Sequence, residues 1–219
     1  MSTAVIGVGQ IGSAVARNLV QGGEEVVLAA NEEEHAAKLA TELGGRARSA
    51  SVEDAIAEAD AVVLAVWLDT MKELIPAHAD ALTGKVVIDP SNPIGFENGQ
   101  AVRTLPEDQS SASVVASLLP AGAHYVKAFG TLGAASLASV ANRSPRRVVL
   151  FYATDDDVAA GSVEELIASA GFDPVRAGGV DDARRLEVPG GDLHEQGGLG
   201  GKLLNVDEAR GAIAVHSQA

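Results

Sequence analysis

Three glycines stand where an apolar run gives way to a helical pattern near the start of the sequence. The segment AVIGVGQIGSAVARNLV (residues 4–20) places Gly7, Gly9 and Gly12 in a G-x-G-x-x-G spacing. In a strand–turn–helix unit the first glycine permits a sharp bend, the second lets a pyrophosphate approach the backbone, and the third lets helix and strand pack closely. Free N–H groups and the helix dipole then favour phosphate. The pattern predicts a dinucleotide site; a tight turn without a ligand is the alternative.

The residues after the second apolar run bear on which dinucleotide would bind. A carboxylate about twenty residues beyond the last glycine commonly accepts a hydrogen bond from the ribose 2′-hydroxyl of NAD. Glu32 lies at that distance, Asn31 precedes it, and the next cation in the sequence is Lys38. This local charge favours NAD over NADP. The competing interpretation is that the acidic run 32–34 is only the solvated first turn of a helix.

No group of side chains in the sequence has the spacing of a catalytic or metal-binding set, so we assign no catalytic residue and no metal ligand. The chain has no cysteine, which excludes disulfides and thiolate chemistry, and redox chemistry would therefore depend on a bound cofactor. Tyr125, Lys127 and His194 are the candidate proton donors. For Lys127 the sequence leaves two positions open, in the pocket or at a sheet end, and for His194 a plain loop role is the alternative.

Composition and charge limit the classes of partner. Hydrophobic residues make up 47% of the 219 residues and aromatic residues 3%, which is typical of a parallel α/β core built from Ala, Val, Leu and Ile. The net charge of −14 argues against a nucleic acid partner. The sequence shows neither a basic leader nor an apolar run of membrane-spanning length, so we expect a cytoplasmic protein that does not bind membranes.

Hydrophobic periodicity predicts strands that alternate with helices. This alternation indicates parallel crossover units and helices on both faces of a sheet. The polar stretch 91–113 has little periodicity and is expected to be a functional loop. Strands are predicted at 4–8, 24–30, 46–51, 61–66, 85–90, 124–129, 146–154 and 173–178, and helices at 13–20, 32–43, 52–59, 71–82 and 158–170.

The predicted fold class is α/β: a Rossmann-like, doubly wound, mainly parallel sheet with a small loop-rich C-terminal extension. Residues 1–180 are expected to form the dinucleotide-binding domain. Residues 181–219 are expected to be an extension or lid of the same domain, with 189–202 as its least structured part.

Five segments occur in the order and spacing of a known family: AVIGVGQIGSAVARNL, ADAVVLAVW, KVVIDPSNP, LLPAGAHYVKAFGT and DDARRLE. The sequence resembles the NADP oxidoreductase, coenzyme F420-dependent family. The resemblance implies hydride transfer between a nicotinamide dinucleotide and a deazaflavin, and a homodimer. It also implies a set of cofactor-binding positions, to which we add Asn31 and Glu32 from the reasoning above. These positions are Gly7, Gly9, Gln10, Ile11, Gly12, Val66, Trp67, Asn92, Pro93, Ala128 and Phe129.

Two departures from the family pattern concern the two ends of the site. Asn31 stands where relatives commonly place an arginine for the 2′-phosphate, so the cofactor is NADP by resemblance and NAD by local charge. Gly130 replaces the asparagine of the family's KAFNT segment, which leaves the acceptor open. The alternatives are a dinucleotide-binding sensor without turnover, or a reductase of a small carbonyl, imine or flavin.

Overall fold

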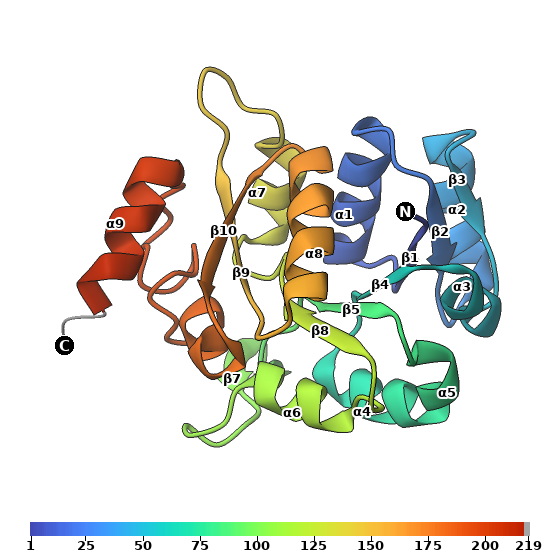
Figure 1. Cartoon of the computed structure of the whole chain (residues 1–219), viewed down its shortest axis with the longest axis horizontal. Helices are drawn as coiled ribbons and strands as arrows, with labels where there is room; N and C mark the ends of the chain where they lie inside the picture. Colours follow the sequence, from blue (N-terminus) through green and yellow to red (C-terminus); the bar gives the residue numbers. More distant parts are fainter. Residues whose placement is uncertain (217–219) are drawn as a thin grey trace.

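The computed structural model describes residues 1–216 and has a main sheet of eight strands (Figure 1). Its central strands are short apolar segments buried on both faces. Its eight strands follow the order β10-β9-β8-β5-β4-β1-β2-β3. In this order, the six neighbouring strands β8, β5, β4, β1, β2 and β3 are parallel to one another. Strand β9 runs antiparallel to β8. The strands are β1 (Thr3–Ile6), β2 (Val26–Ala29), β3 (Ala47–Ser49), β4 (Ala61–Leu64), β5 (Val86–Asp89), β8 (His124–Lys127), β9 (Val149–Ala153) and β10 (Asp173–Gly178).

Helices cover both faces of this sheet, so the core consists of two layers (Figure 1). Alternate strand residues point to opposite layers: Val5 and Val63 belong to one, whereas Ala4 and Val62 belong to the other. The first layer contains α1 (Gln10–Gln21), α2 (Glu33–Leu43), α7 (Ala134–Ser139) and α8 (Asp157–Ser169). The second contains α3 (Val52–Glu58), α4 (Leu68–Ala77), α5 (Ala79–Leu82), α6 (Ser111–Leu118), the 3-10 helix η1 (Val180–Leu186) and α9 (Val206–His216), which lies beside the edge strand β10.

This architecture confirms the predicted mainly parallel α/β fold, with local differences. The helix predicted at 71–82 is two helices, because the chain leaves the helical conformation at His78. The stretch 91–113 is not a plain loop. It contains a hairpin of β6 (Ile94–Glu97) and β7 (Gln100–Arg103), and its end enters α6.

Residues 181–219, which were predicted to be a loop-rich extension, differ most from the prediction. Within its described part, up to residue 216, this stretch begins in η1 and ends in α9, and residues 217–219 lie outside the description. The glycine-rich part 189–202 has no regular element, yet Leu193 is 1% exposed and His194 is 2% exposed. A bidentate ion pair between Arg185 of η1 and Asp192, with an N–O distance of 2.8 Å, ties this loop to η1. Backbone hydrogen bonds within the loop, such as that from the N–H of Gly198 to the carbonyl of Gly191 (2.9 Å), stabilise it without a regular element.

The turn between β1 and α1 depends on glycine at two positions for steric reasons. A Cβ atom at Gly12 would lie 1.9 Å from the carbonyl oxygen of Gly7. Gly7 itself has a φ of +94°, and a Cβ there would lie 2.4 Å from the carbonyl oxygen of Ala65. At Gly9, in contrast, a Cβ would meet no atom within 4 Å.

These distances predict different effects of two alanine substitutions on stability. Gly12→Ala should lower the free energy of unfolding by at least about 2 kcal/mol, because the backbone of the turn must move away from the helix. Gly9→Ala should change it by less than about 1 kcal/mol, because Gly9 is extended and has room for a methyl group. Urea unfolding of both variants tests this difference. Equal losses in the two variants would contradict the close approach at Gly12.

Candidate active site

The carboxyl ends of the parallel strands open into a cavity of about 410 Å³. Five segments surround it: the turns after β1, β4, β5 and β8, and the C-terminal segment after η1. A cleft at this edge is where ligands bind in open α/β sheets. The lining residues are Gly9, Gln10, Ile11, Ala65, Val66, Trp67, Leu68, Pro90, Ser91, Asn92, Ile94, Gly130, Leu132, Gly133, Ala134, Val188, His194 and Gln196.

The N-terminus of α1 opens into this cavity. Its N-cap residue is Gly9, no side chain caps it, and its first turn carries no acidic residue. Gly9, Gln10 and Ile11 line the cavity, and the space beside Gly9 is empty of protein atoms. Unsatisfied N–H groups and the positive end of the helix dipole make such a terminus suitable for a phosphate group. The turn therefore fits the pyrophosphate of a dinucleotide.

Two other helix N-termini near the cavity are occupied by carboxylates from the C-terminal segment. Glu187 accepts hydrogen bonds from the backbone N–H groups of Ser111 (3.1 Å) and Ala112 (3.0 Å), which begin α6. Glu195 accepts one from the N–H of Gly133 (2.6 Å), at the start of α7. These carboxylates complement the dipoles of α6 and α7. The starts of α1 and α4 also reach the cavity without a side-chain cap, but α4 has Asp69 in its first turn, so the start of α1 is the one better suited to an external anion.

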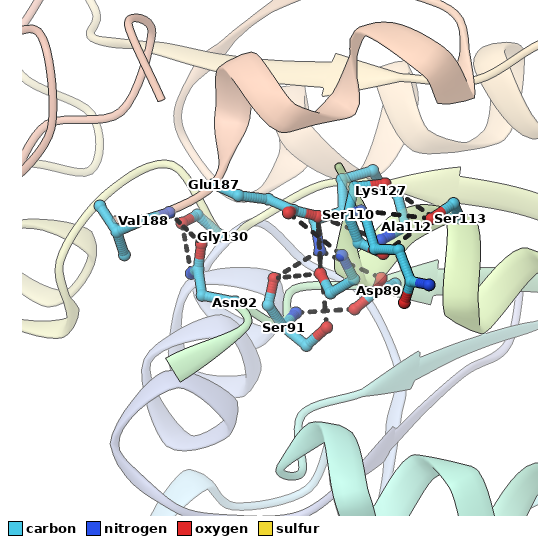
Figure 2. A network of polar contacts seen from close by, with 12 residues as sticks. Asp89, Ser91, Asn92, Ser110, Ala112, Ser113, Lys127, Gly130, Glu187 and Val188 are labelled. Carbon is cyan, nitrogen blue, oxygen red and sulfur yellow. Dashed lines mark hydrogen bonds and ion pairs between the residues drawn. The ribbon is translucent and has the colours of Figure 1, made fainter. Parts of the chain in front are cut away.

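Behind the cavity wall, a buried ammonium group joins three segments of the chain (Figure 2). The Nζ atom of Lys127, at the end of β8, lies 3.1 Å from Asp89 at the end of β5 and 3.3 Å from Glu187. It also donates to the hydroxyl of Ser111 and to the backbone carbonyl of Ser91, which lines the cavity. All three charged side chains are at most 2% exposed. A buried charge requires this degree of pairing.

The two carboxylates of this network outnumber its one ammonium group, and neutral donors compensate for the difference. Asp89 accepts hydrogen bonds from the hydroxyl of Tyr125 (2.9 Å) and the N–H of Ser91 (2.7 Å). Burial, followed by the nearby carboxylates, raises the pKa of Tyr125 well above its ordinary value. Neither Tyr125 nor Lys127 lines the cavity. Lys127 therefore lies at the sheet end, one of the two positions considered from the sequence, but its ammonium group is buried behind the cavity wall and does not reach solvent.

Asn92 connects the strand-end turns to the C-terminal segment (Figure 2). Its side-chain amide nitrogen donates to the carbonyl of Gly130 (3.2 Å), and its oxygen accepts from the N–H of Val188 (2.9 Å). Gly130 is sterically required here, because a Cβ would lie 2.6 Å from the carbonyl oxygen of Pro90. The departure from the family pattern at position 130 thus permits close packing of the turns after β5 and β8.

His194 is the one ionisable side chain that lines the cavity within residues 1–216. Its Nδ1 atom accepts a hydrogen bond from the backbone N–H of Gln196 (3.0 Å), and the ring also bonds to the backbone of Gly130. Burial lowers its pKa to about 4, although the bond to Gly130 acts in the opposite direction. At neutral pH the imidazole is therefore uncharged and both its polar contacts are within the protein.

The structure brings part of the sequence-predicted set together. Gln10, Ile11, Val66, Trp67 and Asn92 line the cavity with Gly9. Gly7 and Gly12 shape the turn without lining it, and Pro93, Ala128 and Phe129 do not line it either. Ala128 and Phe129 are 1% and 0% exposed and belong to the core. Asn31 and Glu32 are exposed at the start of α2, outside the cavity, and Glu32 lies 3.3 Å from Nδ1 of His35.

Other lining residues were not in the predicted set, notably Ser91, Gly130, Val188 and Gln196. Ser91 could have been found from its place directly after a strand. Val188 and Gln196 carry no sequence signal, because their contribution depends on how the C-terminal segment crosses the sheet edge. No charged side chain lines the cavity in the described part of the chain. Among the same residues, no cluster of three or more histidines and carboxylates is placed to hold a metal ion.

Comparisons with known proteins agree with this geometry. Residues 2–93 match the family model described as NADP oxidoreductase, coenzyme F420-dependent. The F420-dependent NADP reductase of Methanothermobacter thermautotrophicus is 32% identical over 199 residues, which cover 85% of this chain and 85% of that protein. The metalloreductase STEAP3 of Rattus norvegicus is 30% identical over 184 residues; these cover 84% of this chain but only 35% of that protein.

A solved structure extends the likeness over the whole fold. A hypothetical protein from Sinorhizobium meliloti has a TM-score of 0.81 at 30% identity, covering 94% of this chain and 95% of that one. The relatives confirm the family resemblance that the sequence motifs indicated. The Sinorhizobium structure confirms the Rossmann-like fold. In the described chain no helix is both long enough and apolar enough to cross a membrane.

The lowered pKa of His194 predicts a pH dependence of stability. Its pKa of about 4 in the folded protein is below the ordinary value of 6.5, so the unfolded chain binds more protons between these values. Stability is therefore full above about pH 6.5 and decreases as the pH falls towards 4. Between pH 7 and 4.5 the wild type should lose about 2 kcal/mol more than His194→Gln.

Urea unfolding of both proteins at pH 7, 5.5 and 4.5 measures this difference. Carboxylates titrate in the same range, but they are common to both proteins and cancel in the comparison. Parallel pH profiles would contradict a neutral, buried His194.

Proposed function

This chain belongs to the NADP oxidoreductase, coenzyme F420-dependent family and is thus a nicotinamide-dependent oxidoreductase, and we propose that its cavity is the site of hydride transfer. The uncapped N-terminus of α1, with free space beside Gly9, is the observation that carries the proposal. It would hold the pyrophosphate of the dinucleotide. The nicotinamide end would then enter the cavity, and the adenosine end would lie over the end of β2.

Residues around the cavity would orient the nicotinamide. Val66 follows β4 on one side, and Asn92 follows β5 on the other. We place Asn92 within hydrogen-bonding reach of the nicotinamide ribose or carboxamide. Its contacts with Gly130 and Val188 hold the amide in one orientation. Hydride transfer between rings depends mainly on such positioning, because the cofactors carry the reactivity.

The reaction we propose moves a hydride from the reduced nicotinamide to an acceptor that also takes up one proton. The products are the oxidised nicotinamide and the acceptor reduced by two electrons. The ionisable side chain of the lining, His194, is neutral and already bonded to the backbone. A ring acceptor that takes its proton from water suits this cavity better than a carbonyl or imine, which needs a proton at the site.

Coenzyme F420 is the acceptor that we propose first, since the Methanothermobacter relative is named an F420-dependent NADP reductase. Other acceptors remain candidates, among them flavins and small carbonyl or imine compounds. A dinucleotide-binding sensor without turnover is the competing class. A homodimer and a cytoplasmic location are further parts of the proposal, the first testable by light scattering.

A titration with NADPH, NADH and coenzyme F420 tests the proposed function, and Gly9→Ala is its sharpest variant. A methyl group at Gly9 would occupy the empty space assigned to the pyrophosphate, so dinucleotide affinity should fall at least tenfold while the protein stays folded. Calorimetry measures the affinity, and loss of absorbance of the reduced nicotinamide measures turnover. Unchanged dinucleotide affinity in Gly9→Ala would show that the pyrophosphate does not bind at this turn. Binding without turnover by any acceptor would favour the sensor.

A second prediction concerns the choice between NAD and NADP. Asn31 offers a neutral amide beside the carboxylate of Glu32, and both are exposed. Without a cation to pair with it, a 2′-phosphate should gain little affinity here, so we expect weak discrimination or a preference for NAD. Asn31→Arg should raise NADPH affinity roughly tenfold and leave NADH affinity within about twofold.

Asn31→Gln is the matched control, because it lengthens the side chain without adding charge and should change neither affinity. Calorimetric titrations of the three proteins at one fixed salt concentration make the comparison. Tight and strongly selective NADPH binding by the unmodified protein would contradict the prediction. Such selectivity would require a cation distant in sequence near the 2′-phosphate.

A further inference from the structure

Two large aromatic side chains are exposed to solvent beside the cavity. Trp67 is 58% exposed and Phe96 is 64% exposed, although almost all other large hydrophobic side chains in the described chain are covered. Their ring centroids lie 6.2 Å apart with the ring planes at 90°, an edge-to-face pair. Trp67 lines the cavity, so the pair is continuous with it.

Separate elements bring these two rings together. Trp67 follows β4 and is the N-cap residue of α4. Phe96 lies in β6, in a two-stranded hairpin outside the main sheet. The hairpin turns at Asn98 and Gly99, which both have positive φ (51° and 79°), as a tight type I′ turn requires.

Hydrogen bonds at the base of the hairpin order it together with the chain that follows. The N–H of Thr104 donates to the carbonyl of Pro93 (2.9 Å), and the side chain of Arg103 donates to the carbonyls of Pro106 and Gln109. Ile94, at the start of the same hairpin, lines the cavity. An exposed apolar group next to a ligand cavity marks a contact surface for what enters it.

We propose that Trp67 and Phe96 form the stacking site for the planar tricyclic ring of the hydride acceptor, a flavin or a 5-deazaflavin. This inference rests on the proposed function and assigns the acceptor side of the same cavity. An edge-to-face pair leaves a ring face free for a further ring to stack on, and aromatic stacking suits a large uncharged ring.

The lack of charged side chains in the cavity lining favours an uncharged ring over an acidic substrate. No charged side chain lines it within residues 1–216, so a carboxylate substrate would find no cation to pair with. A flavin-type ring needs an apolar platform and a few polar groups at its edge. Ser91 and Gln196 supply such groups around the lining.

The chain contains a single tryptophan, so its fluorescence reports on this site alone. The experiment titrates riboflavin in one arm and a 5-deazaflavin in the other into the full-length protein saturated with oxidised dinucleotide, so that no turnover occurs. We expect saturable quenching of Trp67 and a matching affinity by calorimetry. The arm with the tighter binding identifies which ring the site prefers.

Substitutions at Phe96 separate stacking from simple apolar contact. Phe96→Ala should weaken ring binding five- to tenfold. Phe96→Tyr should restore affinity to within twofold of wild type, whereas Phe96→Leu should remain weak. Dinucleotide affinity should stay within twofold in all three variants. Val158→Ala is the matched control, because it truncates another exposed apolar side chain, 57% exposed at the start of α8, and should change neither affinity.

Three outcomes in Phe96→Ala would overturn the inference without touching the proposed function. These are unchanged ring affinity, an equal loss of dinucleotide affinity, or a change of oligomeric state, which would make the pair a subunit contact. If wild type bound neither ring, the inference and the choice of coenzyme F420 would both fail, but hydride transfer to a small carbonyl or imine would still stand. Failure of the proposed function looks different: wild type would then bind no dinucleotide, or transfer no hydride from it to any acceptor.

Discussion

The ammonium group of Lys127 is the contact on which the geometry of the cavity depends. It joins Asp89 at the end of β5, Glu187 of the C-terminal segment and Ser111 at the start of α6, all in the protein interior. Removal of one partner from such a buried group costs about 3–5 kcal/mol, because the remaining charges lose their compensation. The residues that follow β5 and β8 form the floor of the cavity. Any loosening of this network would therefore shift Ser91, Asn92 and Gly130 together.

The last part of the chain completes the cavity by fastening itself to both layers of helices. Glu187 binds the N-terminus of α6 in one layer, and Glu195 binds that of α7 in the other. Between them, Val188 donates to Asn92 and His194 bonds to the backbone of Gly130. The segment therefore needs no regular secondary structure to be held in place. Its carboxylates occupy α6 and α7 but not α1, whose N-terminus at Gly9 has no side-chain cap and is the one that we propose for the phosphate.

Local patterns in the sequence determine the parts of this structure that could be predicted from it. The β-α alternation and the glycine spacing depend on neighbours within about thirty residues, and they predicted the sheet, most helices and the glycine turn between β1 and α1. Helix α6 was missed because the serines at its start were included in the preceding polar stretch, although Ser110 and Ser113 form its capping box. The burial of Lys127 and His194 could not be predicted from the sequence for another reason. Each depends on partners far away in the sequence, which only the folded chain brings together.

The two ends of the cavity are consequently specified in different ways. The end that we propose for the phosphate is built from backbone: an empty space at Gly9, a close approach at Gly12 and the dipole of α1. It requires glycine at the close approach but no functional side chain. The opposite end consists of side chains from separate loops, with Trp67 after β4 and Phe96 on the hairpin. Backbone geometry of this kind changes little unless the fold changes, whereas loops accept substitution and insertion readily. The same fold can therefore keep its dinucleotide and exchange its acceptor, and the identity of the acceptor must be sought in the hairpin and the C-terminal segment.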